Sequence, residues 1–410
     1  MALTDFSSWL DERRRGPSAW FVKRLQANDT LATGSHQAGP YLPKPFLFAV
    51  CPALQNEAEK NPRVEFDTYI DSQGDYRQVR AIWYNNRLHG GTRNETRITG
   101  FDGARSDLLD PESTGAIAIL AFDLSDSSAP ICHAWVCRDE TESDLVEAIV
   151  GQVDPGTAVT WVAEGTPEPA RFSLPRRRKT GPAVNDGETL AIPHGRNEPP
   201  TVDMLVMQSA LAQPLASQPV DTRLLRRHEG FIDLFRQLEH DLYTPSALSG
   251  FPDIASLLET AERIHTGRQA RDDGLALQLR HLLIEDGLTE GACFSFRPEI
   301  GTARSPDFVF PAVATRGGAR TPTILLVEPI IRDRWKAAVE ETGATKVHML
   351  TLQRGVSLAQ FEEMIGAGVT LVVPARLHDT YPSEIRSDLV SLESFVADVR
   401  HLAAPVRRRG

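Results

Sequence analysis

Residues 83–101 read WYNNRLHGGTRNETRITGF, and this stretch decides the fold prediction for the first part of the chain. It predicts a strand, a polar turn with two adjacent glycines, and a second strand. Because side chains alternate along a strand, Arg93, Glu95 and Arg97 fall on one face. Arginine donates to O6 and N7 of guanine and glutamate accepts from N4 of cytosine, so this face suits G·C pairs in a major groove. The alternative is a solvated face held by cross-strand ion pairs.

The first 163 residues carry the signals of a compact, mostly β domain, a barrel or pseudobarrel. Runs of strand-forming residues are separated by Gly, Pro, Asp and Asn. Strands are expected at 46–51, 63–70, 78–84, 95–99, 116–122, 133–136 and 158–162. Two short helices are expected in the same part of the chain, at 18–25 and 142–150.

Residues 164–214 are predicted to be a linker, because Pro, Arg, Gly and Glu dominate there and apolar periodicity disappears, apart from a short helix at 205–211. Residues 215–405 change to helical periodicity, starting at 222 and continuing along 254–264 and 275–284. Strands at 307–310, 323–327, 346–352 and 369–373 then alternate with helices at 333–342 and 358–365. This alternation is typical of an α/β sheet covered by helices. Residues 406–410 form a basic tail.

The composition limits the classes of function. The 410 residues are enough for two or three domains, and the net charge of −11 argues against indiscriminate nucleic-acid binding. Positive charge is bunched locally, however, at 13–15, 176–179, 226–227 and 407–409, where phosphate contacts are plausible. The four cysteines lack paired ligand spacing, so we expect reduced thiols. The acidic N-terminus and the short apolar runs predict a cytoplasmic protein with no membrane contact.

A pair of acids in the second half has the layout of a nuclease site. Asp307 follows Pro306 at the start of an apolar strand, and Glu328 ends the next strand. Nucleases of the PD-(D/E)xK type hold Mg²⁺ with acids placed in this way, and the ion lowers the pKa of a water and neutralises charge on the phosphate. Pro-Asp also begins many ordinary turns, so the pattern alone is weak.

Ordered matches along most of the chain resemble the EcoRII family of two-domain type II restriction endonucleases. In the first half they cover 21–30, 34–37, 84–99 and 135–138, and in the second half 305–308, 333–335, 350–357, 371–374, 377–378 and 381–382. The resemblance implies an α+β multidomain protein, with a B3-like DNA-binding β pseudobarrel followed by an α/β restriction-endonuclease-like domain. It further implies a homodimer, double-stranded DNA as partner, a site related to CCWGG, and Mg²⁺-dependent phosphodiester cleavage.

The family's catalytic positions carry over unevenly. By resemblance, Asp307 matches the metal-binding aspartate and Glu341 matches the acid on the following helix. Glu328 stands where the family has a lysine, Arg332 where it has a second basic residue, and Ala276 where it has a helical glutamate. Two outcomes follow: Asp307, Glu328 and Glu341 bind metal while Arg332 supplies the positive charge, or hydrolysis is lost and a DNA-binding regulator or defence component remains.

Further candidates for DNA contact are polar and cationic side chains in both halves. They are Lys23, His36, Tyr41 and Arg87 in the first half, and Arg226, Arg227, Arg268 and Arg271 in the second. Such contacts position a protein on DNA, while base contacts specify the sequence. A metabolic α/β enzyme would need a phosphate loop or a dinucleotide fingerprint, and the sequence contains neither.

Overall fold

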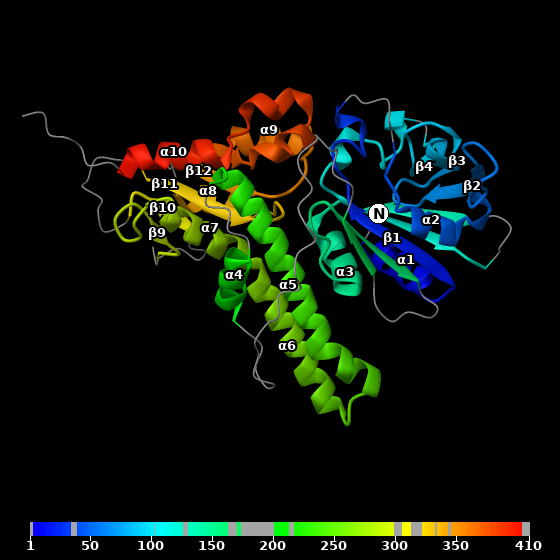
Figure 1. Ribbon diagram of the computed structural model, residues 1–410, viewed down its shortest axis with the longest axis horizontal. Helices are drawn as coiled ribbons and strands as arrows, with labels where there is room; N and C mark the ends of the chain where they lie inside the picture. The colour runs from blue at the N-terminus through cyan, green and yellow to red at the C-terminus, as the bar shows by residue number, and fades with distance from the viewer. Residues whose placement is uncertain are drawn as a thin grey trace, which may run out of the picture. The chain divides into compact units, whose positions relative to one another are not determined.

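The computed structural model describes residues 3–33, 39–101, 103–125, 130–162, 170–173, 201–212, 217–298, 306–312, 322–332, 334–342 and 346–403. The chain divides into two compact units (Figure 1). The first unit is Met1–Arg177 with Gln353–Glu363 and Asp379–Ser387, and the second is Arg178–Leu352 with Met364–His378 and Asp388–Gly410. Within the described residues, no helix is both long enough and apolar enough to span a membrane.

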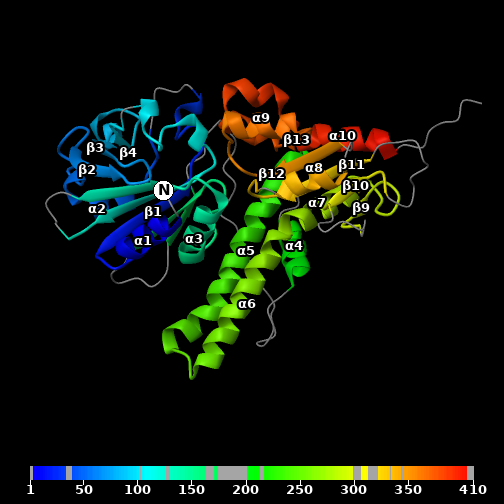
Figure 2. The same cartoon turned by 180° about the vertical axis from the view of Figure 1, so that it is seen from behind.

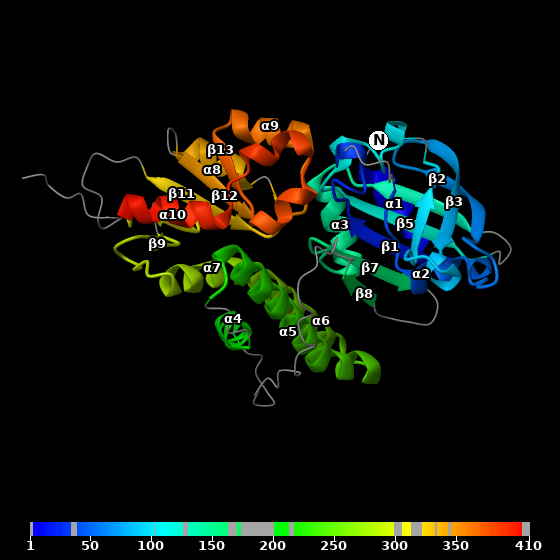
Figure 3. The same cartoon turned by 45° about the horizontal axis from the view of Figure 1, so that its top comes forward.

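The first unit is built on one eight-stranded sheet that curls into a half barrel (Figure 3). Its strand order is β4-β3-β2-β6-β5-β1-β7-β8, and every neighbouring pair is antiparallel except β2 and β6. The strands are β1 (Ser18–Arg24), β2 (Arg63–Ile70), β3 (Asp75–Tyr84), β4 (Glu95–Thr99), β5 (Ile117–Asp123), β6 (Ile131–Val136), β7 (Thr157–Val162) and β8 (Ala170–Ser173). The helices are α1 (Leu3–Arg14), α2 (Lys44–Val50) and α3 (Glu140–Val150).

Strand β1 lies between β5 and β7 and is buried on both faces. Phe21 joins the core that contains α2, where its ring lies 5.8 Å from that of Phe46. Trp20 points to the opposite core, beside Trp9 of α1 at 6.2 Å. The predicted helix at 18–25 is therefore wrong: a strand covered on both faces shows no polar alternation, and an apolar run of this length fits either structure.

The predicted strand at 46–51 is also wrong, because this segment is helix α2. Pro43 is the residue before the helix and Pro45 lies in its first turn, where the missing amide hydrogen costs nothing. The predicted strands that correspond to β2 through β7 are confirmed, as is helix α3. Helix α1 has no counterpart in the prediction, and β8 lies inside the predicted linker, whose boundaries at 163 and 214 fall outside the described residues.

The second unit joins a helical hairpin to a five-stranded sheet of order β13-β12-β11-β10-β9. Helices α5 and α6 run side by side, as two opposite views show (Figures 1 and 2). The strands are β9 (Ser295–Phe296), β10 (Phe308–Phe310), β11 (Thr323–Glu328), β12 (Lys346–Thr351) and β13 (Val369–Val372). The helices that follow the linker region are α4 (Val202–Leu211), α5 (Val220–Ser249), α6 (Ile254–Asp272), α7 (Gly274–Glu285), α8 (Arg334–Thr342), α9 (Leu358–Gly366) and α10 (Leu392–Ala403). The predicted helices and strands of this part are confirmed, and β9 and α10 are additional.

Strand direction changes within this sheet. β9, β10 and β11 are antiparallel neighbours, whereas β11, β12 and β13 are parallel. Antiparallel neighbours run in opposite directions, so the start of β10 and the end of β11 lie side by side at the same end of these two inner strands. This geometry brings Asp307 and Glu328 together.

A buried carboxylate fixes the start of α5. Asp221 accepts hydrogen bonds from the backbone amides of Ala375 at 2.9 Å, Leu392 at 3.1 Å and Glu393 at 3.0 Å. Two of these amides belong to the first turn of α10, where the Ser391 hydroxyl accepts a further hydrogen bond from the amide of Ser394. Asp221 therefore caps α10 and connects two distant segments of the second unit.

The core of the second unit should make the protein sensitive to acid. Burial lowers the pKa of His348 on β12 to about 4, with a further contribution from Lys346, while Asp398 acts in the opposite direction. The unfolded chain binds a proton near pH 6.5 but the folded chain does not, so stability falls as the pH drops from about 6.5 to about 4. Between pH 6.5 and pH 4 the free energy of unfolding should therefore fall by roughly 2–3 kcal/mol less in His348→Gln than in the natural protein, as measured by chemical denaturation at each pH. The same substitution at exposed His401 is the control, and an unchanged pH profile for His348→Gln would contradict the prediction.

Candidate nucleic-acid interface and nuclease site

Four residues that the sequence analysis predicts to contact DNA lie around the start of β4, and after that prediction we name them the DNA-reading face: Tyr41, Arg93, Glu95 and Arg97. Arg93 lies just before the strand, and its Nε donates to Oε1 of Glu95 at 2.5 Å. Nε of Arg97 lies 3.3 Å from the same oxygen, and Tyr41 pairs with Arg97 through an isolated β-bridge. The two arginines thus converge on one carboxylate, through ion pairs between residues two positions apart along the chain rather than across strands.

Electrostatics and stacking hold this cluster in place. Burial alone would raise the pKa of Glu95, but the hydrogen bond from Arg93 and the charge of Arg97 outweigh it and lower that pKa. The guanidinium carbon of Arg93 lies 3.7 Å from the ring centroid of Tyr84, which faces Glu95 across the strand pair. A planar guanidinium stacked on an aromatic ring is restricted in its motion before any ligand arrives.

Backbone hydrogen bonds fix the turn that leads into β4. Residues Asn86–His89 form a 3-10 helix that ends at Gly90, whose φ of 81° is a left-handed value that favours glycine. The backbone amide of Arg87 donates to the carbonyl of Arg93 at 3.0 Å. Exposed Arg87 is therefore held next to Arg93 through the backbone.

Lys23 has a different environment from the one expected of a DNA contact. It is buried on β1, and its Nζ lies 2.6 Å from Oδ2 of Asp29. Burial lowers the pKa of Lys23, and Asp29 acts in the opposite direction. We therefore leave Lys23 out of the DNA-reading face. His36 lies outside the described residues.

The cationic candidates of the second unit are mostly engaged within that unit. Arg227 and Arg268 lie 2.9 Å and 2.6 Å from glutamate carboxylates. Arg271 is buried, with its guanidinium 5.7 Å from an aromatic ring, and Arg226 is half-buried on α5. The ion pairs of Arg227 and Arg268 go to Glu285 and Glu239, and the ion pairs described for Asp307 come from Arg297 and Arg334 instead.

Asp307 and Glu328 are brought together, as the strand pattern predicts. Asp307 directly precedes β10 and Glu328 is the last residue of β11. The exposed fractions are 2% and 7%, so both carboxylates are almost fully withdrawn from water. Oδ2 of Asp307 accepts a hydrogen bond of 2.9 Å from the backbone amide of Val327 on β11.

Two arginines that the sequence analysis does not identify neutralise this pair. Nη1 of Arg334, at the start of α8, lies 3.0 Å from Oδ2 of Asp307 and 3.9 Å from Oε1 of Glu328. Nε of Arg297, after β9, lies 3.5 Å from Oδ1 of Asp307. Arg297 also pairs with Asp273 at the end of α6. Arg334 lies in the stretch 333–335 that resembles the family and at the start of the predicted helix after Glu328, but neither signal assigns it to the two acids.

Glu328 is the unusual acid of the site. Burial raises its pKa to about 7, and the charge of Asp307 adds to this effect. The backbone amide of Arg332, which donates to Oε2 at 3.0 Å, and the positive charges of Arg334 and Arg332 act in the opposite direction. Arg332 is predicted to supply the positive charge of the site. In the structure its backbone amide binds Glu328, and its charge has a smaller effect on the pKa of Glu328 than the charge of Arg334.

The described side chains do not fit a divalent-ion site. The donors near Asp307 are two guanidinium groups and a backbone amide, and the described residues include no group of three His, Cys, Asp or Glu side chains that could hold a metal. Glu341 lies on α8, and its side chain is outside the described part. Ala276 is buried in α7 and supplies no carboxylate.

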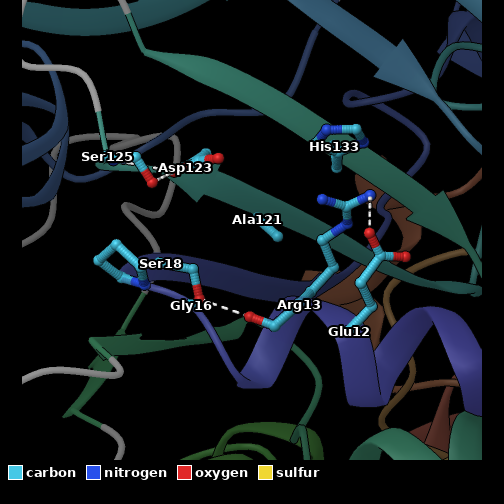
Figure 4. Close-up of a pocket in the computed structure, with 9 residues that line it drawn as sticks. Glu12, Arg13, Gly16, Ser18, Ala121, Asp123, Ser125 and His133 are labelled. Carbon is cyan, nitrogen blue, oxygen red and sulfur yellow. Dashed lines mark hydrogen bonds and ion pairs between the residues drawn. The ribbon is translucent and has the colours of Figure 1, made fainter.

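A separate small cavity of about 140 Å³ lies in the first unit (Figure 4). Asp123 at its edge accepts hydrogen bonds from the hydroxyl and amide of Ser125, which lower the pKa of Asp123. Ser18 donates to the carbonyl of Arg13 on another wall. The predicted site residues do not line this cavity, whose walls are Glu12, Arg13, Gly16, Pro17, Ser18, Ala121, Asp123, Ser125 and His133.

Comparison with known proteins decides the family. Residues 16–165 match the family "Restriction endonuclease EcoRII, N-terminal", and residues 235–396 match "EcoRII C terminal". An Escherichia coli protein described as "Type II restriction enzyme EcoRII" is 31% identical over 425 aligned positions, which cover 99% of this chain and 100% of that protein. The chain belongs to the EcoRII family of type II restriction enzymes. The fold expected from this family, a B3-like half barrel and an α/β restriction-endonuclease-like domain, is confirmed.

Solved structures with the same kinds of domain resemble each half of this EcoRII-family chain. One is described as a PspGI restriction endonuclease complex with substrate DNA, with 11% identity, a TM-score of 0.40, and coverage of 50% of this chain and 93% of that one. Another is the B3 domain of the UbaLAI restriction endonuclease with cognate DNA, with 16% identity, a TM-score of 0.27, and coverage of 40% and 99%.

Proposed function

We propose that this member of the EcoRII family binds double-stranded DNA sequence-specifically and reads G·C pairs with the DNA-reading face of its first unit. The observation that supports this most directly is the convergence of Arg93 and Arg97 on Glu95. The family resemblance suggests a site related to CCWGG, whose outer pairs are G·C.

The cluster is suited to exchange its partners. The side chains of Arg93 and Glu95 are 36% and 28% exposed, so their ion pair is in contact with water and is weak. Guanine can take over both donors of an arginine in one bidentate contact, and Glu95 is then free to accept from cytosine. Because Arg93 is already stacked on Tyr84, less conformational entropy is lost on binding. The overall charge of −11 makes base contacts more important than bulk attraction.

Replacing Arg93 or Arg97 by Ala should cost about 1–3 kcal/mol of discrimination between the selected site and random duplex DNA, if the lost contact is bidentate. Competition gel shifts with the full chain, after site selection from a random library, measure this. Arg77→Ala is the matched control, because Arg77 also pairs with an aspartate but projects from β3 on the side opposite to Tyr84. Equal affinity of the natural protein for selected and random DNA would refute the proposal.

For the second unit we propose that hydrolysis is lost or strongly reduced. A lysine at the position of Glu328 would offset phosphate charge and orient the attacking water, whereas a buried carboxylate adds repulsion. The protein would then act as a DNA-binding regulator or a DNA-sensing defence component. The second candidate is Mg²⁺-dependent cleavage by Asp307, Glu328 and Glu341 with Arg332 supplying positive charge, and it is supported by the proximity of two buried acids where β10 begins and β11 ends. That reaction would require the guanidinium of Arg334 to move.

Plasmid DNA that carries the selected site should stay intact with Mg²⁺ and with Mn²⁺. Glu328→Lys alone should not restore cleavage, because Ala276 still lacks the helical carboxylate of the family. Gel electrophoresis of the plasmid after incubation gives the result. Cleavage that Asp307→Ala abolishes would establish the three-acid nuclease instead, and cleavage that persists in Asp307→Ala would place the active site elsewhere.

We propose that the protein is a homodimer, since a duplex cut in this family needs two active sites related by a dyad and the scaffold is retained here. Sedimentation equilibrium of the full chain at micromolar concentration should give twice the chain mass of 45.2 kDa. The measured mass should be unchanged in Arg93→Ala, because this substitution alters the DNA-reading face alone. A mass of one chain across this concentration range would contradict the proposal.

A further inference from the structure

We infer that the guanidinium of Arg334 is the resident cation of the Asp307–Glu328 pair, so that a divalent ion can bind there only when Arg334 leaves. The inference deepens the proposed loss of hydrolysis and concerns the same carboxylates. Its test needs no DNA, so it can fail while specific DNA binding holds, and the reverse is also possible.

One nitrogen atom contacts both acids. Nη1 of Arg334 is 3.0 Å from Asp307 and 3.9 Å from Glu328, which places it between the two carboxylates. A divalent ion shared by two carboxylates would occupy the same region, although with shorter distances of about 2.0–2.1 Å for Mg²⁺. The guanidinium and the ion are therefore mutually exclusive at this position.

The acceptor capacity of Oδ2 of Asp307 is already used. A carboxylate oxygen offers two lone pairs, and Oδ2 accepts from the amide of Val327 and from Arg334. The Val327 amide is part of a buried central strand, so its donor cannot turn to water. An ion that binds Oδ2 must therefore displace Arg334.

Burial makes the internal cation necessary. Two carboxylates that are 2% and 7% exposed would be strongly destabilising without a nearby positive charge. Arginine remains charged at all pH values relevant to proteins, so it supplies this charge without a cofactor. Arg297 cannot replace Arg334 in this role, because it lies on the Oδ1 side of Asp307 and is shared with Asp273.

The test is Mn²⁺ binding to the DNA-free full-length protein, measured by calorimetry and by the electron paramagnetic resonance signal of free Mn²⁺. Arg334→Gln should bind one Mn²⁺ per chain at least tenfold more tightly than the natural protein, and adding Asp307→Asn should remove that gain. Arg334→Lys keeps a cation in place and should show no gain. Arg400→Gln, which breaks an ion pair with Asp286, is the matched control and should behave like the natural protein.

Two results would overturn the inference. The first is an Arg334→Gln protein that is folded by circular dichroism but binds Mn²⁺ no better than the natural protein. The second result does not depend on how Arg334→Gln folds. It is that the natural protein binds Mn²⁺ and that Asp307→Asn alone removes the calorimetric heat of Mn²⁺ binding. That result would show that the carboxylates are open to metal while Arg334 is present, whereas an unchanged trace for Asp307→Asn supports the inference.

Discussion

The requirement that buried negative charge be neutralised governs the edge of the sheet where β10 and β11 meet. Asp307 and Glu328 are both withdrawn from water, and two arginines neutralise them: Arg334 lies between the two acids and Arg297 lies beside Asp307. In the family arrangement a lysine would stand at position 328 and would itself balance an aspartate. By resemblance Glu328 stands where the family has a lysine, and in this chain Nη1 of Arg334, at the start of α8, lies within 3.9 Å of both acids.

The chain uses the same pairing of arginine and carboxylate twice, with different energetic consequences. At the DNA-reading face, Glu95 is 28% exposed, and exposed ion pairs of this kind contribute about 0–1 kcal/mol, so they separate readily when a base offers better partners. At the nuclease site the acids are buried, and breaking a buried pair typically costs about 3–5 kcal/mol. The exposed pair can therefore separate at little cost, as the proposed exchange with bases requires, whereas the buried pair is held together.

Sequence reasoning predicts alternating strands well and fails where alternation is absent. The polar face of β4 made its strand predictable, but β1, with Trp20 and Phe21 in two separate cores, gives an unbroken apolar run. Asp307 and Glu328 were found because proline and strand ends mark them in sequence. Arg334 could not be found in this way, since only the folded chain shows which arginine reaches a carboxylate.

The hydrogen bonds of Asp221 have a consequence for how the second unit forms during synthesis. Its three amide partners lie 154, 171 and 172 residues further along the chain. The start of α5 thus leaves the ribosome long before the residues that satisfy its carboxylate, and Asp221 must stay hydrated until Leu392 and Glu393 arrive. Contacts between residues so distant in sequence form slowly. A chain cut short before α10 would keep the acid but lose two of its three donors, and would expose an unfinished core to aggregation.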